Sequence, residues 1–141
     1  MPVERHDTLT VAATRAGFER GADEFRTVLD ACGVTGGPRY QAELVFEEVV
    51  LNTIRHGFHD EGDGHAIDVS IVFQLGALVM TFEDDAAAFD PRERPDPVLP
   101  KSLDTAREGG LGLMLVRKLA RDVQYERTSD RNRLTVTIGA S

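Results

Sequence analysis

The sequence predicts an α+β domain in which helices cover one face of a mostly antiparallel sheet. Three observations support this fold class. Two stretches of helical periodicity follow a short β-prone segment, two closely spaced β-prone runs come next, and two more end the chain. The chain has 141 residues, the usual length of one domain, so we expect residues 1–141 to form a single unit.

The first half of the chain contains the clearest patterns. Residues 8–11 are β-prone, and residues 14–31 carry apolar side chains at helical spacing before a stop at Gly33. After a turn, the strongest helix is expected from Arg39 to about Arg55. Its apolar residues lie at i, i+3, i+4, i+7, i+8 and i+12, and they are Ala42, Val45, Phe46, Val49, Val50 and Ile54.

The middle of the chain predicts a hairpin followed by a long loop. Residues 66–73 and 77–82 are β-prone and are separated by a Leu-Gly turn. Residues 84–108 are polar and contain four prolines. Since structureless loops longer than about 12–15 residues are usually functional or disordered, this segment is a candidate lid.

The end of the chain predicts a helix and a second pair of strands. The helix is expected over residues 109–120, opened by glycines. The strands are expected over 123–127 and 134–138, with a turn over 129–132 between them.

Composition excludes several classes of function. The 16 Lys and Arg residues against 24 Asp and Glu residues give a net charge of −8, which argues against a general nucleic-acid or anionic-membrane surface. The single cysteine, Cys32, excludes an internal disulfide and is expected to act as a small core hydrophobe. No apolar run approaches the ~20 residues of a membrane span and no signal peptide is visible, so we expect a cytoplasmic protein.

Two acidic clusters are candidates for chemistry. Glu48 and Asn52 are four residues apart and share one face of the predicted helix, where they could hold a divalent cation or orient a nucleophile. Glu83, Asp84 and Asp85 follow an apolar run and could bind a metal or read the edge of a base. The alternatives are an ordinary solvated helix face and an ordinary charged strand end.

A glycine-rich segment at residues 109–112 is the third candidate. Glycines at a helix start allow close approach of phosphate to free N–H groups. The spacing fits neither the Walker nor the Rossmann pattern. A hinge for a mobile loop is the alternative.

Taken in order, these segments resemble the motifs of a known superfamily. EVVLNTIRHG at 48–57 resembles the N box of the GHKL (Bergerat) ATPases. DDAAAFDP at 84–91 resembles their first glycine box, and GGLGLMLV at 109–116 their second. Within that superfamily the short chain, the HGF and FDP triplets and the RNRLTVT segment at 131–137 are similar to the anti-sigma-factor serine kinases. The resemblance covers residues 8–138.

The resemblance implies a two-layer Bergerat fold and an ATP:protein serine/threonine kinase that acts as an anti-sigma factor. Its partners would be a sigma factor and a STAS-domain anti-anti-sigma protein phosphorylated on serine, and a homodimer is possible. Glu48 would be the general base or orienting group, Asn52 would hold Mg²⁺, and Asp84 would accept a hydrogen bond from the adenine amino group. The phosphates would approach Gly110, Leu111 and Gly112, with residues 92–108 as the ATP lid.

One residue departs from the pattern. Families of this type usually have glycine two residues after the adenine-binding aspartate, where this chain has Ala86. A positive φ there would cost alanine about 1 kcal/mol, and a methyl group could crowd the base. A second hypothesis is therefore a non-catalytic partner-switching module with weak or lost ATP binding. A catalytic domain detached from a two-component histidine kinase is a third, against which the short chain and the absence of an upstream phosphoacceptor helix pair count.

Overall fold

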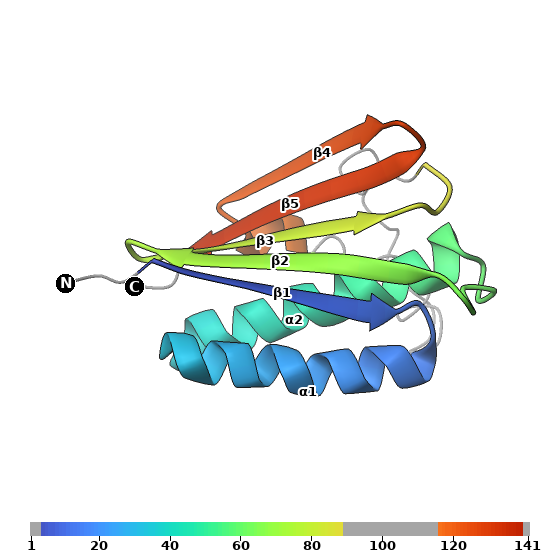
Figure 1. The fold of residues 1–141 in the computed structure, drawn as a ribbon. Helices are drawn as coiled ribbons and strands as arrows, with labels where there is room; N and C mark the ends of the chain where they lie inside the picture. Colours follow the sequence, from blue (N-terminus) through green and yellow to red (C-terminus); the bar gives the residue numbers. More distant parts are fainter. Residues whose placement is uncertain (1–3, 89–115, 140–141) are drawn as a thin grey trace, which may run out of the picture.

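The computed structural model describes residues 4–88 and 116–139, which form an antiparallel sheet with helices on one face (Figure 1). The sheet order is β1-β2-β3-β5-β4. All four pairings between the described strands are antiparallel, so the sheet as described has no parallel pair and the predicted α+β class is confirmed. The elements are β1 (Arg5–Ala12), α1 (Arg15–Cys32), α2 (Gly36–Asn52), η1 (Thr53–Gly57), β2 (Ala66–Gln74), β3 (Ala77–Asp84), β4 (Asp122–Thr128) and β5 (Arg131–Gly139).

Helix α1 begins and ends as the sequence predicts. The Thr14 side chain caps it by accepting a hydrogen bond from the Gly17 N–H at 3.0 Å, and Gly33 closes it with φ of 73°. Gly17 also allows the helix to approach β1, because a Cβ at this position would lie 2.1 Å from the Ala12 carbonyl oxygen. The first helix is thereby fixed against the end of the first strand.

Helix α2 differs from its prediction at both ends. It begins at Gly36 rather than Arg39, with Pro38 inside the first turn, where no amide N–H is needed. The regular α-helix ends at Asn52 and continues as one π-helical turn, in which the Phe58 N–H donates to the Thr53 carbonyl at 3.0 Å. Ile54, the last residue of the predicted apolar face, is buried within this turn. The apolar pattern therefore does not show where the α-helix changes into a π turn.

The two hairpins turn on pairs of residues with positive φ. Leu75 and Gly76 have φ of 41° and 75°, as expected for the predicted Leu-Gly turn. In the second hairpin Ser129 and Asp130 have φ of 51° and 65°. The prediction of a turn extending to Asn132 is therefore wrong, because β5 already begins at Arg131.

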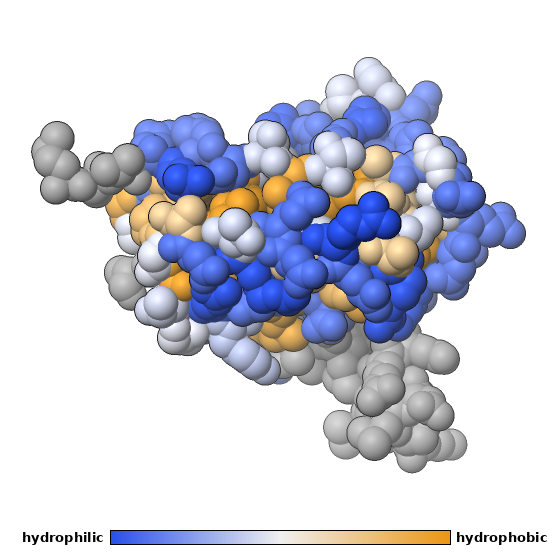
Figure 2. All heavy atoms as spheres, turned by 60° about the horizontal axis from the view of Figure 1, so that its bottom comes forward, coloured by the Kyte–Doolittle hydropathy of each residue, from blue (hydrophilic) through white to orange (hydrophobic). Residues whose placement is uncertain are grey.

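One apolar core lies between the sheet and the helices. Phe25 and Phe46 stack with ring centroids 4.6 Å apart, and Phe46 also contacts Phe82 from β3. Phe18 is also buried, and the partly buried Cys32 packs against this core. The helical side that is turned forward in Figure 2 is mostly hydrophilic, with smaller hydrophobic areas between.

Two further expectations concern the rest of the chain. No helix among the described residues is long and apolar enough to cross a membrane. Residues 116–119 are helical, in agreement with the predicted helix, whereas its first part and the predicted loop beyond residue 88 lie outside the described residues.

Candidate functional site

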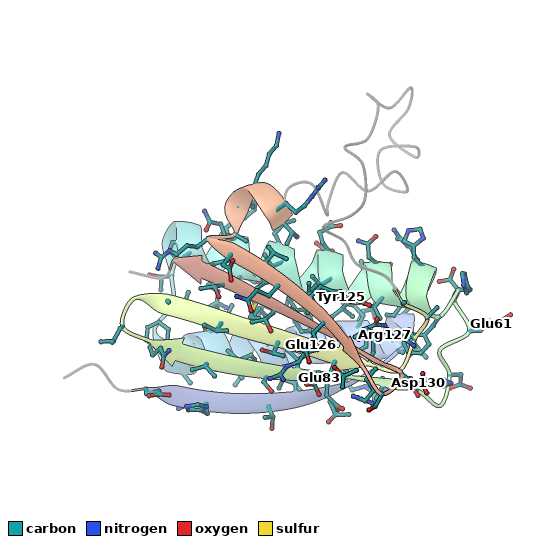
Figure 3. The ribbon with its side chains drawn as sticks, turned by 90° about the horizontal axis from the view of Figure 1, so that it is seen from above. Glu61, Glu83, Tyr125, Glu126, Arg127 and Asp130 are labelled. Atoms are coloured by element: carbon teal, nitrogen blue, oxygen red, sulfur yellow. The ribbon has the colours of Figure 1, made fainter. Side chains whose placement is uncertain are left out.

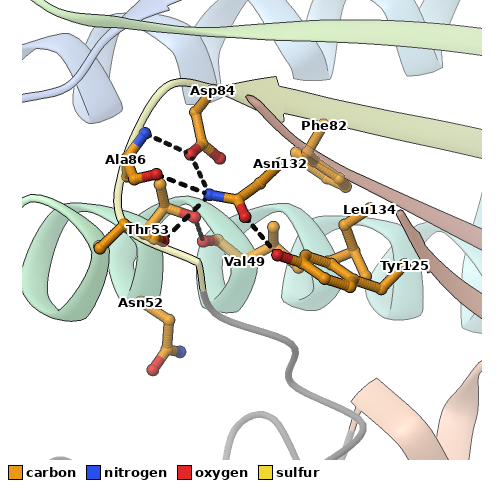
Figure 4. Close-up of a pocket in the computed structure, with 11 residues that line it drawn as sticks. Val49, Asn52, Thr53, Phe82, Asp84, Ala86, Tyr125, Asn132 and Leu134 are labelled. Carbon is orange, nitrogen blue, oxygen red and sulfur yellow. Dashed lines mark hydrogen bonds between the residues drawn. The ribbon is translucent and has the colours of Figure 1, made fainter. Parts of the chain in front are cut away.

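A cavity opens where the end of α2 and the π turn face the ends of β3 and β5 (Figure 4). Its volume is about 420 Å³, including space open to solvent. It brings together Asn52 and Asp84, which the sequence placed in two separate clusters. The lining residues are Val49, Asn52, Thr53, Gly57, Phe82, Asp84, Ala86, Ala87, Tyr125, Asn132 and Leu134.

Asp84 is a buried carboxylate at the base of this cavity. Its Oδ1 accepts hydrogen bonds from Asn132 Nδ2 at 2.9 Å and from the Ala86 N–H at 3.0 Å. Within the described part of the chain Oδ2 accepts none, which leaves one acceptor for a ligand. Burial raises the pKa of Asp84, although both hydrogen bonds and the charge of Arg131 favour ionisation.

Asn132 is the residue that sequence reasoning missed. It lies directly opposite Asp84 in the β3–β5 pairing and is buried. Its Nδ2 donates to Asp84 and also to the carbonyls of Ala86 and Ala87, each at 3.1 Å. Asn132 belongs to the RNRLTVT segment at 131–137, but a polar Arg-Asn-Arg stretch after Ser-Asp is typical of a turn.

Two side chains of β4 complete this network (Figure 3). The Tyr125 hydroxyl and Arg127 Nη1 both donate to Asn132 Oδ1, the latter at 3.1 Å. Arg127 Nη1 also donates to the Ala86 carbonyl at 2.9 Å. Strand β4 therefore supports the base of the cavity although the sequence offered no motif there.

Asn52 lines the cavity from the end of α2. Its Nδ2 donates to the Glu48 carbonyl at 2.6 Å, which fixes the amide and leaves Oδ1 free of the helix. In Figure 4 Asn52 lies apart from the hydrogen-bonded cluster around Asn132. No group of three or more His, Cys, Asp or Glu suited to a metal occurs in the described ranges. One amide oxygen fits Mg²⁺, which usually keeps waters and takes few protein ligands when phosphates supply the rest.

Glu48 lies one helical turn before Asn52 and does not line the cavity. The Asn52 side chain donates to the backbone carbonyl of Glu48, and the Glu48 carboxyl group takes no part in that bond. Burial raises the pKa of the half-buried Glu48 carboxyl, and so does the charge of Glu47, while Arg55 lowers it. The structure thus places Glu48 outside the cavity and near its Asn52 side.

Ala86 does not carry the backbone strain considered from the sequence. The described non-glycine residues with positive φ do not include it. Its N–H donates to Asp84, its carbonyl accepts from Arg127 and Asn132, and its methyl group is buried. Gly110, Leu111 and Gly112, and the predicted lid at 92–108, lie outside the described residues.

Together these features define a class. A two-layer α+β domain with a buried acceptor beneath a cavity, and an amide oxygen on the adjoining helix, is suited to a nucleotide. Residues 11–138 match the model of the histidine kinase-like ATPase domain, and the chain belongs to this family. The family assignment confirms the resemblance to the GHKL ATPases, and membership implies use of ATP.

Curated relatives point to protein kinases. The chain is 32% identical over 99 residues to the serine/threonine-protein kinase BtrW of Bordetella bronchiseptica, covering 70% of this chain and 69% of the relative. It is 27% identical over 121 residues to the serine-protein kinase RsbW of Listeria monocytogenes, covering 83% and 66%. The chain thus spans about two thirds of each relative, and their names support a protein kinase activity.

Two solved structures share the fold. One holds the RsbU and RsbW domains of a Mycobacterium tuberculosis protein, with a TM-score of 0.67 and 15% identity over 96% of this chain and 32% of that one. The other is the SiaB–SiaC complex from Pseudomonas aeruginosa, with a TM-score of 0.59 and 17% identity over 94% and 88%. Both likenesses agree with the sheet-and-helix arrangement described above.

Proposed function

We propose that this chain is a cytoplasmic ATP:protein serine/threonine kinase that acts as an anti-sigma factor. Its substrate would be a serine of a STAS-domain anti-anti-sigma protein, and it would also bind a sigma factor and possess no nucleic-acid site of its own. The observation that carries the proposal is the buried Asp84 carboxylate at the base of a cavity that Asn52 also lines. The kinase names of the relatives support it.

Asp84 would recognise the base of the nucleotide. Its Oδ1 is already occupied by two donors, so Oδ2 would accept a hydrogen bond from the adenine amino group. Hydrogen bonds to an ionised acceptor are the stronger ones, and the surrounding donors favour that state. A base that presents an acceptor at this position would instead meet a negative charge.

Asn52 Oδ1 would hold Mg²⁺, which neutralises phosphate charge when bound. The anchored amide orients this oxygen without help from a metal. Gly110, Leu111 and Gly112 would admit the phosphates to backbone N–H groups, and residues 92–108 would cover the nucleotide. The roles of these three residues and of the lid rest on the sequence alone.

Glu48 would act as the general base. The serine hydroxyl oxygen attacks the γ-phosphorus, the bond from that phosphorus to the oxygen of the ADP leaving group breaks, and the hydroxyl proton passes to the Glu48 carboxylate. A raised pKa makes this carboxylate a better proton acceptor than an exposed one.

The test is transfer of radiolabelled γ-phosphate from ATP to a purified STAS protein encoded near this one. We expect labelled phosphoserine with the wild-type chain and none with Glu48→Gln, while both bind ATP equally in calorimetry. Glu43→Gln, on the same helix but paired with Arg39, is the matched control and should transfer normally. Unchanged transfer by Glu48→Gln would contradict the catalytic assignment.

A non-catalytic partner-switching module is the second candidate. The observation that favours it is the absence of Glu48 from the cavity lining. Calorimetric titration with Mg-ATP and a thermal melt in its presence distinguish the two hypotheses. A module that has lost ATP binding gives neither heat of binding nor a shift in Tm. Sedimentation of the chain alone tests the possible homodimer.

A further inference from the structure

We infer that Asn132 is a positioning residue of the proposed nucleotide site, which fixes the oxygen that Asp84 presents and holds the backbone at Ala86 and Ala87 against β5. The inference rests on the proposed function. It goes beyond it by assigning a role to a residue that lies in none of the three motifs, 48 positions after Asp84.

Hydrogen bonds with five other residues converge on the Asn132 side chain. Nδ2 has two hydrogens and faces three acceptors within 3.1 Å, and Oδ1 accepts from two donors of β4. The carboxamide is therefore fully used, and it is 6% exposed. Buried polar groups with this many partners fix a single local arrangement.

The two carboxylate oxygens of Asp84 are not equivalent. Both described donors to its side chain reach Oδ1, one from Asn132 and one from the Ala86 N–H. These two bonds set the rotation of the carboxylate about its bond to Cβ. Oδ2 is consequently the oxygen available to a ligand.

Asparagine supplies both a donor and an acceptor at position 132, which an ionised carboxylate cannot do. Aspartate has nearly the same shape as asparagine but no donor when ionised, so Asn132→Asp would set a second carboxylate against Asp84 Oδ1 and against two carbonyls. Protonation of the introduced carboxyl group restores one donor. The substitution therefore converts a fixed hydrogen bond into one that depends on pH.

Other polar and charged groups near Asp84 also influence how nucleotide affinity depends on pH. Asp85 follows it and pairs with His65 at 3.1 Å, Arg131 lies within electrostatic range, and Arg127 and Tyr125 reach it through Asn132. All of them are present in the wild type and in the variants. The ratio of the variant's dissociation constant to that of the wild type at each pH therefore cancels the effects that both proteins and the nucleotide share.

The experiment measures binding of fluorescent N-methylanthraniloyl-ADP with Mg²⁺ between pH 5.5 and 8.5. For Asn132→Asp we expect a dissociation constant about tenfold or more above wild type at pH 8, because a hydrogen bond to a charged group is lost. The ratio should fall toward one as the pH falls. Arg133→Gln, the next residue on the opposite face of β5, should bind as wild type at every pH.

Each result decides the matter. A ratio near one at all pH values, or a raised ratio that does not change with pH, overturns the inference. If Asn132→Asp does not melt cooperatively, Asn132→Ser replaces it; we expect a raised KM for ATP with unchanged kcat, and an unchanged KM overturns the inference. Absence of nucleotide binding by the wild type contradicts the proposed function itself, and the inference falls with it.

Discussion

Gly57 and Ala86 meet at the edge of the cavity so closely that a Cβ on Gly57 would lie 2.9 Å from the Cβ of Ala86. Packed carbon atoms do not approach to this distance. Gly57 ends the π turn, and Ala86 stands where the resemblance to the GHKL ATPases implies a glycine. The Ala86 methyl group therefore fits because the facing residue, Gly57, has no side chain. The backbone of Ala86 is not strained, since its φ is not positive.

The first prediction follows from this contact. Gly57→Ala should destabilise the chain by about 1–3 kcal/mol, the usual range for overpacking. Ala86→Gly in the same chain should recover most of the loss, because it removes the opposing methyl group. Urea unfolding of the wild type, the two single variants and the double variant gives the coupling free energy between positions 57 and 86. Gly37→Ala, with no atom within 4 Å of its added Cβ, is the control; additive effects would contradict the contact.

The second prediction concerns the pH dependence of phosphate transfer. Because Glu48 must be ionised to accept a proton and its pKa is raised, the rate should increase with pH until that pKa is passed. Glu47→Gln removes a neighbouring negative charge, which lowers the pKa of Glu48 and moves the rising limb of the profile to lower pH. A profile of kcat against pH checks this, and a limb that moves to higher pH would exclude Glu48 as the base.

The third prediction separates the roles of Asp84 in binding and in stability. Asp84→Asn preserves an acceptor for Asn132 Nδ2 and the Ala86 N–H but turns an amide N–H toward the cavity, so adenine nucleotides should no longer bind. Burial raises the pKa of Asp84 in the folded chain above its value in the unfolded chain. The wild type therefore loses stability as the pH rises through the window between these two pKa values. The variant lacks this loss.

Two measurements check this third prediction. Calorimetry with ATP should show no binding by the variant at neutral pH. Thermal melts should show a difference in Tm between variant and wild type that grows in favour of the variant as pH rises across the window. A variant that binds ATP as well as the wild type would remove Asp84 from base recognition.

The fourth prediction tests the core beneath the site. Phe46 contacts both Phe25 and Phe82, and thereby joins α2 to α1 and to β3. Phe46→Ala should cost about 3–5 kcal/mol of the free energy of unfolding. Tyr40→Ala on the same helix, where the side chain is 69% exposed, should cost far less. Denaturant unfolding followed by circular dichroism compares them.

The sequence predicts those elements whose signals are local. Thr14 and Gly33 bound α1 because a cap and a left-handed glycine act on their own helix. The Leu75-Gly76 turn is likewise set by its own two residues. Glu48, Asn52 and Asp84 could be named because they lie in ordered motifs, and whether they perform the proposed chemistry stays a prediction.

The features that escaped prediction depend on contacts between distant segments. Asn132 belongs to a strand because β3 pairs with it, whereas its neighbours alone favour a turn. The separation of Glu48 from the cavity depends on how α2 is rotated against the sheet, and helical spacing alone cannot specify that rotation. Such properties arise from tertiary packing, which overrides local preference.

The hydrogen bond between Asp84 and Asn132 also bears on how this family can vary. The bond joins two residues that are 48 positions apart in the sequence. The stretch between them therefore forms a loop whose two ends are held together at the bottom of the cavity. The entropy of closing a flexible loop grows only slowly with its length, by about 0.6 kcal/mol for each doubling. Insertions in this stretch could therefore accumulate over evolutionary time and diversify what surrounds the proposed nucleotide site, while the pairing of Asp84 with Asn132 remains intact.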